Sequence, residues 1–279
     1  MRKLGLIAGG GALPVEIANY CQSAGRPFAV MRLRGFSGPE LRDFPGVDVG
    51  LAELGKCIKA LCAAGCEAVC FAGNVARPDF AALKPDLRGL AALPGVIAAA
   101  RDGDDALLRR ILAEFEKEGF AIEGAHEVMA ELTLPLGPLG RLRPRDADIA
   151  DIERALDVAR QIGRLDVGQG CVVCRGLVLA VEAQEGTDAM LRRVAELPEA
   201  LRGSTSAPCG VLAKAPKPIQ ETKVDLPTIG VATVQRVARA GLAGIVGEAG
   251  RLLVLDQAAV IAMAEELGVF IIGLEPANP

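Results

Sequence analysis

The stretch KLGLIAGGGALPVEIANYCQSAGRPFAVMRL, residues 3–33, decides the fold class of this chain. Residues 3–9 are a short apolar run that predicts a buried strand. Residues 12–25 carry apolar side chains at helical spacing and end at Gly25, which predicts a helix. Residues 27–33 predict a second strand. A strand, a helix and a strand in this order are typical of a parallel sheet that helices cover on both faces.

The same alternation continues through the first half of the chain. Residues 54–65 and 104–119 predict helices with one apolar face, and the runs between them predict further strands. We therefore expect a parallel α/β domain over residues 1–132, with a nucleotide bound at the carboxyl ends of its strands. The further strands are expected at residues 47–51, 67–75 and 120–126.

The second half begins after a break in the pattern. Residues 133–147, TLPLGPLGRLRPRDA, contain three Pro, two Gly and three Arg without periodicity, so we expect an interdomain linker there. Helical and strand patterns resume at residue 148, and GCVVCRGLVLAVEA (170–183) predicts two strands joined near Arg175 and Gly176. Paired strands favour a mixed sheet. We expect residues 148–279 to form a distinct C-terminal α/β domain of that kind.

Composition excludes several classes of protein. The formal net charge of −4 provides no global basic surface, so we expect no nucleic-acid partner. The apolar runs are shorter than the ~20 residues that span a bilayer, and the N-terminus lacks the pattern of a signal peptide. Eight Cys and a single His, His126, do not predict a Cys/His zinc centre. In CVVC (171–174) the two thiols point to opposite faces of a strand, so we expect buried thiols in a reducing cytosol.

Three glycines follow the first strand. Gly9, Gly10 and Gly11 allow the backbone to turn sharply and to approach a ligand, and the helix start behind them favours an anion. The spacing resembles a dinucleotide fingerprint, but Pro14 occupies the third glycine position. The second strand ends in MRLRGF (31–36), which has no acidic residue to bind a ribose. Phosphate binding and a tight strand-to-helix turn both stay open.

Two polar residues lie at element ends where ligands bind in α/β folds. Asn74 follows a predicted strand and is positioned to donate to a phosphate or a base, or to adopt a left-handed turn. Asp104 opens a predicted helix, where it either caps the helix or binds a ligand or a metal.

A strand-to-helix corner in the second half is rich in carboxylates. VLAVEAQEGTDAML (178–191) places Glu185, Thr187 and Asp188 around the start of a predicted helix. Thr187 and Asp188 are explained equally well by helix capping. Glu182 lies in or just after an apolar strand, where burial without a partner is costly.

A cationic loop, LAKAPKPIQETKVDLPTIG (212–230), follows in the sequence. It carries Lys214, Lys217, Gln220 and Asp225 on a proline-stiffened segment. Carboxylates that hold a divalent ion, together with lysines that balance phosphate charge, are the requirements of metal-assisted phosphoryl chemistry. A solvated loop in which Asp225 caps the next helix is the alternative interpretation.

Five motifs spread over both halves resemble a known family, the LpxI-type UDP-2,3-diacylglucosamine pyrophosphatases of lipid A biosynthesis. The segments 176–191 and 210–233 carry most of the specificity. QETKVD (220–225) departs conservatively from a more usual QDxRxD form. The motifs are GLIAGGGALP (5–14), FAGNVARPDF (71–80), RDGDDALLR (101–109), GQGCVVCRGLVLAVEAQEGTDAML (168–191) and GVLAKAPKPIQETKVDLPTIGVATV (210–234).

The resemblance implies a Rossmann-like N-terminal domain and a distinct C-terminal catalytic α/β domain. It implies hydrolysis of UDP-2,3-diacylglucosamine to UMP and 2,3-diacylglucosamine 1-phosphate with Mg²⁺ or another divalent cation. It also implies a homodimer, and with the absence of spans we expect a cytoplasmic protein in peripheral contact with the inner face of the inner membrane.

The family motifs and the residue patterns together give the expected site. We expect Asp225, Asp188 and Glu185 to be catalytic and to bind the metal. A nicotinamide-dependent oxidoreductase and a non-catalytic UDP-sugar-binding regulator are the alternatives. The residues expected to bind the substrate are Gly9, Gly10, Gly11, Asn74, Asp104, Thr187, Lys214, Lys217 and Gln220.

Overall fold

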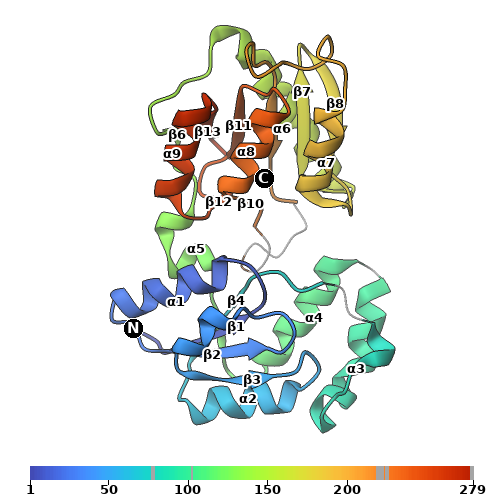
Figure 1. Ribbon diagram of the computed structural model, residues 1–279. Coiled ribbons are helices and arrows are strands. Elements are labelled where there is room, and N and C mark those ends of the chain that lie inside the picture. Colours follow the sequence, from blue (N-terminus) through green and yellow to red (C-terminus); the bar gives the residue numbers. More distant parts are fainter. Residues whose placement is uncertain (77–78, 102, 218–222, 224–225, 277–279) are drawn as a thin grey trace. The chain divides into compact units, whose positions relative to one another are not determined.

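The computed structural model describes residues 1–76, 79–101, 103–217, 223 and 226–276. The chain divides into two compact domains, the first formed mainly by residues 1–130 and the second mainly by residues 131–279 (Figure 1). Helices and strands alternate in both, as the sequence predicts. Among the described residues, no helix is both long enough and apolar enough to cross a bilayer.

The first domain is built on five strands and the helices between them. Its elements are β1 (Leu4–Ala8), α1 (Leu13–Ser23), β2 (Phe28–Leu33), the 3-10 helix η1 (Pro39–Asp43), β3 (Gly46–Val49), α2 (Leu54–Ala63), β4 (Ala68–Ala72), the 3-10 helix η2 (Phe80–Ala82), α3 (Leu87–Arg101), α4 (Asp104–Glu116), β5 (Ala121–Ile122) and α5 (Ala125–Val128).

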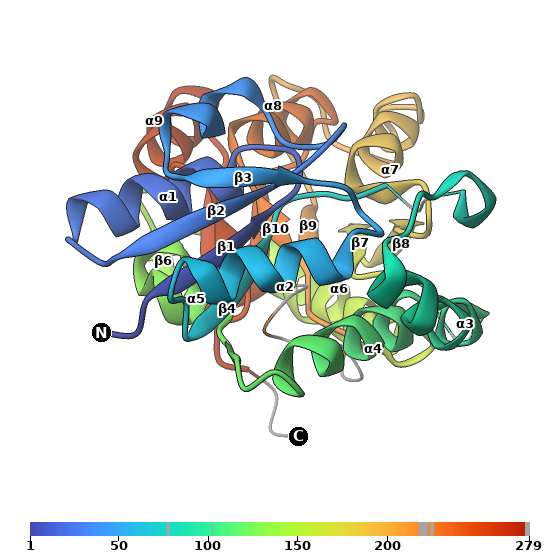
Figure 2. The same cartoon turned by 90° about the horizontal axis from the view of Figure 1, so that it is seen from below.

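These strands form one parallel sheet in the order β3-β2-β1-β4-β5, which confirms the predicted parallel α/β domain. Helices α1 and α2 lie on opposite faces of the sheet (Figure 1), and α2 lies across its strands in the view from below (Figure 2). Ile7 and Met31 pack with Leu61 of α2 and Phe115 of α4 in one apolar cluster. The strand order reverses between β1 and β4, which is where ligands bind in folds of this kind.

The second domain has a larger sheet and a small accessory pair of strands. Its elements are the 3-10 helix η3 (Ala130–Leu132), β6 (Gly137–Leu139), α6 (Asp146–Arg164), β7 (Gly170–Cys174), β8 (Leu177–Val181), α7 (Gly186–Ala195), β9 (Val211–Lys214), β10 (Thr228–Ile229), α8 (Val231–Arg239), β11 (Gly244–Glu248), β12 (Leu253–Val254), α9 (Gln257–Leu267) and β13 (Phe270–Leu274).

The large sheet is mixed, in the order β6-β13-β11-β9-β7-β8, and β10 pairs with β12 separately. Strands β9, β11 and β13 run parallel, while β6 and β7 run antiparallel to their neighbours. Helix α6 packs against one face, and α7, α8 and α9 contribute to the core on the other (Figure 1). The predicted hairpin is confirmed: β7 and β8 are joined by Arg175 and Gly176, both with positive φ. Two consecutive positive φ values are typical of a tight hairpin turn.

The interpretation of residues 133–147 as a linker is corrected by the structure. Residues 137–139 form strand β6, which pairs antiparallel with β13 at the edge of the second sheet. Leu134 and Leu139 are buried in the core of the second domain. Proline and glycine signal a loop in most contexts, but Pro138 is tolerated here because an edge strand need not donate every amide to a neighbour.

Residues 228–229 form the short strand β10, and helix α8 begins soon after it at Val231. The expectation of buried thiols does not hold for Cys62, which is exposed on α2, while Cys57 and Leu61 on the same helix are buried.

The turns after β1 and β4 lie against each other. The Gly9 amide donates to the Ala72 carbonyl at 2.8 Å, and Gly10 and Asn74 exchange two backbone hydrogen bonds of 2.9 and 2.8 Å. Gly73 has φ of +89°, and a Cβ built on it would lie 2.5 Å from the Gly10 carbonyl oxygen. Glycine is therefore required at this position both for its backbone conformation and for the close approach of the two turns.

Replacing Gly73 by Ala tests that requirement. We expect Gly73→Ala to lower the free energy of unfolding by about 2–3 kcal/mol, because strain and a steric clash add. Gly65→Ala is the matched control, since Gly65 has φ of +68° but no atom within 4 Å of the added Cβ. Urea unfolding followed by circular dichroism measures both. Equal losses of unfolding free energy for the two variants would contradict the close approach of the turns after β1 and β4.

Candidate functional site

A buried ionic network lies where strands β8 and β9 of the second sheet end, and this end of the sheet is called its edge here. Lys214 ends β9 and is 3% exposed, and Glu182 directly follows β8 and is 6% exposed. The Lys214 Nζ donates to the Thr187 hydroxyl at 2.6 Å, and that hydroxyl donates to Glu182 Oε1 at 2.9 Å. The distance from Lys214 Nζ to Glu182 Oε2 is 3.7 Å. The three side chains form one hydrogen-bonded unit that we call the 182–187–214 network.

The sheet topology brings these residues together. Strands β8 and β9 both run antiparallel to β7, so their carboxyl ends meet at the same edge. Gly170, at the start of β7, is in register with Lys214. A Cβ on Gly170 would lie 2.3 Å from Glu182 Oε2, and one on Gly168 would lie 1.9 Å from the Glu182 carbonyl oxygen. The two glycines therefore provide the space that the buried carboxylate occupies.

Acceptor atoms at this edge are left without donors. Within the described chain, the buried oxygens Glu182 Oε2 and Gln169 Oε1 have no hydrogen-bond partner. Buried acceptors of this kind are costly unless something satisfies them. Because both atoms are acceptors, the group that completes them is a cation or a hydrogen-bond donor, as a divalent ion or a sugar hydroxyl would be.

The carboxylates expected to bind the metal lie elsewhere on the same corner. Glu185 precedes α7 and pairs with Arg193, and Asp188 pairs with Arg236 at 3.0 Å on the surface. The pKa of Glu185 is below its usual range because its backbone amide and then the Arg193 guanidinium hydrogen-bond to its carboxylate. Both residues therefore have cationic partners that a metal ion would replace.

Thr187 does not cap helix α7, which removes the alternative interpretation of this residue. The N-cap residue is Glu185, and its side chain makes no capping hydrogen bond. The Thr187 hydroxyl instead lies inside the 182–187–214 network. Glu182 is the most buried acidic residue of the corner. Gly168 and Gly170, on the two sides of Gln169, are the feature of the sequence that indicates space for a buried side chain here.

The remaining predicted residues are distributed as follows. Lys217 Nζ pairs with Asp166 Oδ1 at 2.7 Å. Asp104 opens helix α4, but its side chain lies outside the described part of the structure, as do Gln220 and Asp225 altogether.

In the first domain, the expected glycine and asparagine residues do come together. The amides of Gly9 and Gly10 are used by backbone hydrogen bonds, so they are not available to a phosphate. A Cβ on Gly11 would lie 3.8 Å from the Asn74 side-chain nitrogen, which places that amide group beside the turn. Gly11 and Asn74 are thus the two members of this group that remain suited to bind a ligand.

The expected cluster of metal-binding carboxylates is not complete among the described residues. Where the structure describes the chain, three potential ligands come within 4.8 Å of one another at Asp151, Cys174 and Cys209, away from the predicted corner. At the edge that holds the 182–187–214 network, Glu248 is a further buried carboxylate, which Arg160 Nε contacts at 2.7 Å.

The first domain also contains an apolar pocket of about 330 Å³. It extends from the ends of the strands to helices α3 and α4. Its walls are almost entirely aliphatic and aromatic, so it suits a hydrocarbon group rather than a nucleotide. Representative lining residues are Ile7, Leu33, Phe71, Val96, Leu108 and Ile111.

Comparisons with known proteins extend this picture. The model of the LpxI N-terminal domain matches residues 3–132, and that of the LpxI C-terminal domain matches residues 135–272. The chain is 72% identical over 276 residues to the UDP-2,3-diacylglucosamine pyrophosphatase LpxI of Caulobacter vibrioides, covering 99% of each chain. Among solved structures, CobK precorrin-6A reductase has a TM-score of 0.33 and 15% identity, covering 100% of this chain and 90% of the other.

A double-mutant cycle tests the 182–187–214 network. We expect Lys214→Met to lower the free energy of unfolding by about 3–5 kcal/mol, because it leaves the buried Glu182 carboxylate without its cation. Glu182→Gln in the same chain should restore part of that loss, because it removes the uncompensated charge.

The matched control is Arg236→Met, which removes the surface pair with Asp188 and should cost no more than about 1 kcal/mol. Denaturant unfolding is measured for Lys214→Met, for Glu182→Gln alone, for the double variant and for Arg236→Met. Strict additivity of Lys214→Met and Glu182→Gln would show that the two side chains do not interact.

Proposed function

The chain belongs to the LpxI family, and on that premise we propose that it hydrolyses the pyrophosphate bond of UDP-2,3-diacylglucosamine. The products are UMP and 2,3-diacylglucosamine 1-phosphate, an intermediate of lipid A biosynthesis. The observation that carries the proposal is the 72% identity, over nearly all of both chains, to a protein named for this activity.

Lys214 has the central binding role in this proposal. A pyrophosphate carries several negative charges, and hydrolysis requires that charge to be stabilised as water attacks phosphorus. Lys214 is held by Thr187 and is buried, so its ammonium group is preorganised and acts in a medium of low dielectric constant. We assign Lys214 and Thr187 to pyrophosphate binding, and Glu182 to positioning them.

A divalent cation, with Mg²⁺ as the expected one, completes the proposed chemistry. Asp225, Glu185 and Asp188 supply the carboxylate oxygens that Mg²⁺ prefers, and the unsatisfied Glu182 Oε2 is a further oxygen donor of the same kind. When bound, the cation neutralises phosphate charge and activates water. Asp225 is proposed to be essential, while Glu185 and Asp188 must exchange their arginine partners for the ion.

The other predicted residues are assigned to the remainder of the substrate. We propose that Lys217 and Gln220 contact the phosphates, and that Gly11, Asn74 and Asp104 contact the nucleotide. The proposed working form is a homodimer in the cytoplasm, in peripheral contact with the inner membrane from which an acylated substrate is drawn.

The apolar pocket of the first domain is proposed to hold an acyl chain. Its volume and its hydrocarbon walls match the chemistry of a fatty acyl group, and each buried methylene contributes about 0.8 kcal/mol to binding.

Hydrolysis by the purified chain tests the proposed function. Wild type with Mg²⁺ should release UMP from UDP-2,3-diacylglucosamine, and a chelator should abolish the release. Asp225→Ala should lower kcat by about 10³-fold or more, because it removes a charge that stabilises the transition state. Asp43→Ala, at an exposed position in the first domain, is the control.

The UMP-release assay and a separate NADH titration distinguish the alternatives. A regulator would bind UDP-sugars and release no UMP with any metal. A nicotinamide-dependent enzyme would enhance NADH fluorescence on titration. Normal turnover by Asp225→Ala would remove Asp225 from the mechanism while leaving the activity itself established.

Filling the apolar pocket tests the acyl-chain assignment. Ala92 lines the pocket on helix α3, and we expect Ala92→Phe to raise the KM for a long-chain substrate at least tenfold by excluding two or more methylenes. A short-chain substrate should be affected much less. Leu90→Phe is the matched control, because Leu90 lies on the same helix and is 58% exposed. Equal effects on both chain lengths would reject the assignment.

A further inference from the structure

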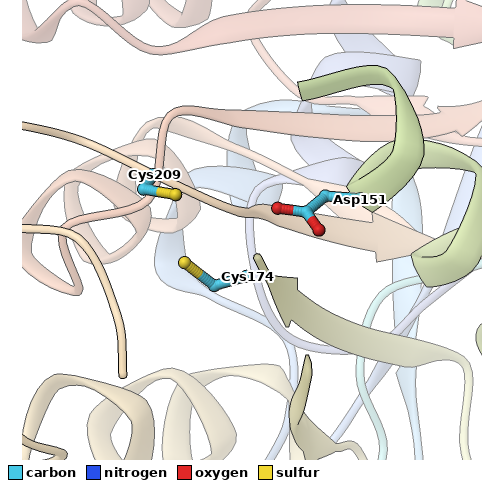
Figure 3. A group of neighbouring side chains, drawn as sticks. All are labelled: Asp151, Cys174 and Cys209. Atoms are coloured by element: carbon cyan, nitrogen blue, oxygen red, sulfur yellow. The ribbon is translucent and has the colours of Figure 1, made fainter. Parts of the chain in front are cut away.

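Three potential metal ligands of the second domain converge at a position that the proposed hydrolysis does not use. The carboxylate of Asp151 and the sulfurs of Cys174 and Cys209 all lie within 4.8 Å of one another (Figure 3). Asp151 and Cys174 are buried, and Cys209 is partly exposed. The three residues are far apart in the sequence, so the fold and not a local motif assembles them.

Each ligand is held in place by backbone structure. Asp151 lies on α6, and its carboxylate accepts the amides of Arg175 and Gly176 at 2.8 and 2.6 Å. Cys174 ends β7 just before that turn. Each carboxylate oxygen keeps a second lone pair, so both amide bonds can persist when the carboxylate binds a cation.

The segment that carries Cys209 approaches unusually closely. Gly210 has φ of +83°, and a Cβ built on it would lie 2.6 Å from Cys174 Cβ. Only glycine allows this approach, and the approach places Cys209 beside Cys174. Cys209 is also only partly buried, so the position is not sealed from solvent on every side.

A disulfide between Cys174 and Cys209 would give Asp151 no part in the chemistry, whereas a metal ion uses all three side chains.

We propose that Asp151, Cys174 and Cys209 form a binding site for a thiophilic divalent cation of the Zn²⁺ class. Two sulfur ligands and one carboxylate oxygen, with water in the fourth position, match the tetrahedral coordination that Zn²⁺ prefers. Sulfur ligands select this class over Mg²⁺, which takes oxygen ligands. The amides of Arg175 and Gly176 orient the carboxylate in the manner of outer-shell contacts at known metal sites.

Binding is a balanced exchange of a metal ion for two protons. The cation replaces the protons of the Cys174 and Cys209 thiols, forms two metal–sulfur bonds and one metal–oxygen bond, and releases two protons to solvent. The net charge of the three ligands and the ion is −1, and the charge of Arg175 acts on Cys174. The apparent affinity therefore rises with pH.

Cobalt(II) substitution is the direct test, because only thiolate ligation produces a sulfur-to-cobalt charge-transfer absorption. The full chain, stripped with a chelator and kept reduced, is titrated with Co²⁺. We expect the band to saturate at one equivalent, Zn²⁺ to displace it, and Zn²⁺ to raise the melting temperature.

The variants assign the ligands. Cys174→Ser and Cys209→Ser should abolish the band, and Asp151→Asn should weaken Co²⁺ binding about tenfold or more. Cys62→Ser, which replaces an exposed thiol elsewhere, should leave the band unchanged. Circular dichroism verifies that each variant folds. If a variant of the buried Cys174 or Asp151 unfolds, the variant of the partly exposed Cys209 still tests the site.

Three results would overturn the proposal. They are no band in the wild type at millimolar Co²⁺, a band that persists in Cys209→Ser, and a Cys174–Cys209 disulfide formed by a mild oxidant in a chain that gives no band. Cys209→Ser should retain Mg²⁺-dependent release of UMP. Loss of the cobalt band and loss of hydrolysis are therefore separate readouts.

Discussion

The constraint on which the second domain depends is the burial of Lys214 beside Glu182. Removing two charged groups from water is costly unless they are paired and hydrogen-bonded, and Thr187 provides the bridge between them. Glycine makes room for the pair: Gly170 lies in register with Lys214 on the neighbouring strand, and a Cβ there would lie 2.3 Å from Glu182 Oε2. Because Gly170 has no side chain, the strand ends have room for a carboxylate beside an ammonium group.

That arrangement divides the acidic corner into two kinds of carboxylate. Glu182 is buried, fixed by neighbours and left with one unsatisfied oxygen, whereas Glu185 and Asp188 are held by Arg193 and Arg236. The buried Glu182 carboxylate fixes Thr187 and Lys214, so the Lys214 ammonium group would act on a phosphate with little reorganisation and weak screening. The exposed pairs contribute little to stability and are free to exchange partners. The same corner thus combines one fixed carboxylate with two carboxylates whose ion-pair partners can change.

Much of the fold was predictable from the sequence, because strand and helix periods alternate clearly in residues 3–33 and the turn at Arg175 and Gly176 breaks an otherwise continuous apolar run. Helix α3 was not identified, since Pro94 lies inside it. Residues 133–147 predict a linker and not strand β6, because their proline and glycine residues are typical of loops. The pairing of Glu182 with Lys214 could not be predicted either, because the two strand ends become neighbours only through β7, which lies between their strands.

Strand β7 also explains why two different ligand sets can coexist in one small domain. It begins at Gly170, in register with Lys214, and ends at Cys174 beside Asp151 and Cys209. At about 3.4 Å per residue, the two ends are roughly 14 Å apart. The residues at the first end offer oxygen ligands, whereas the second end offers two sulfurs beside the Asp151 carboxylate. Sulfur ligands favour thiophilic cations and oxygen ligands favour Mg²⁺, so the two proposed sites would take different cations.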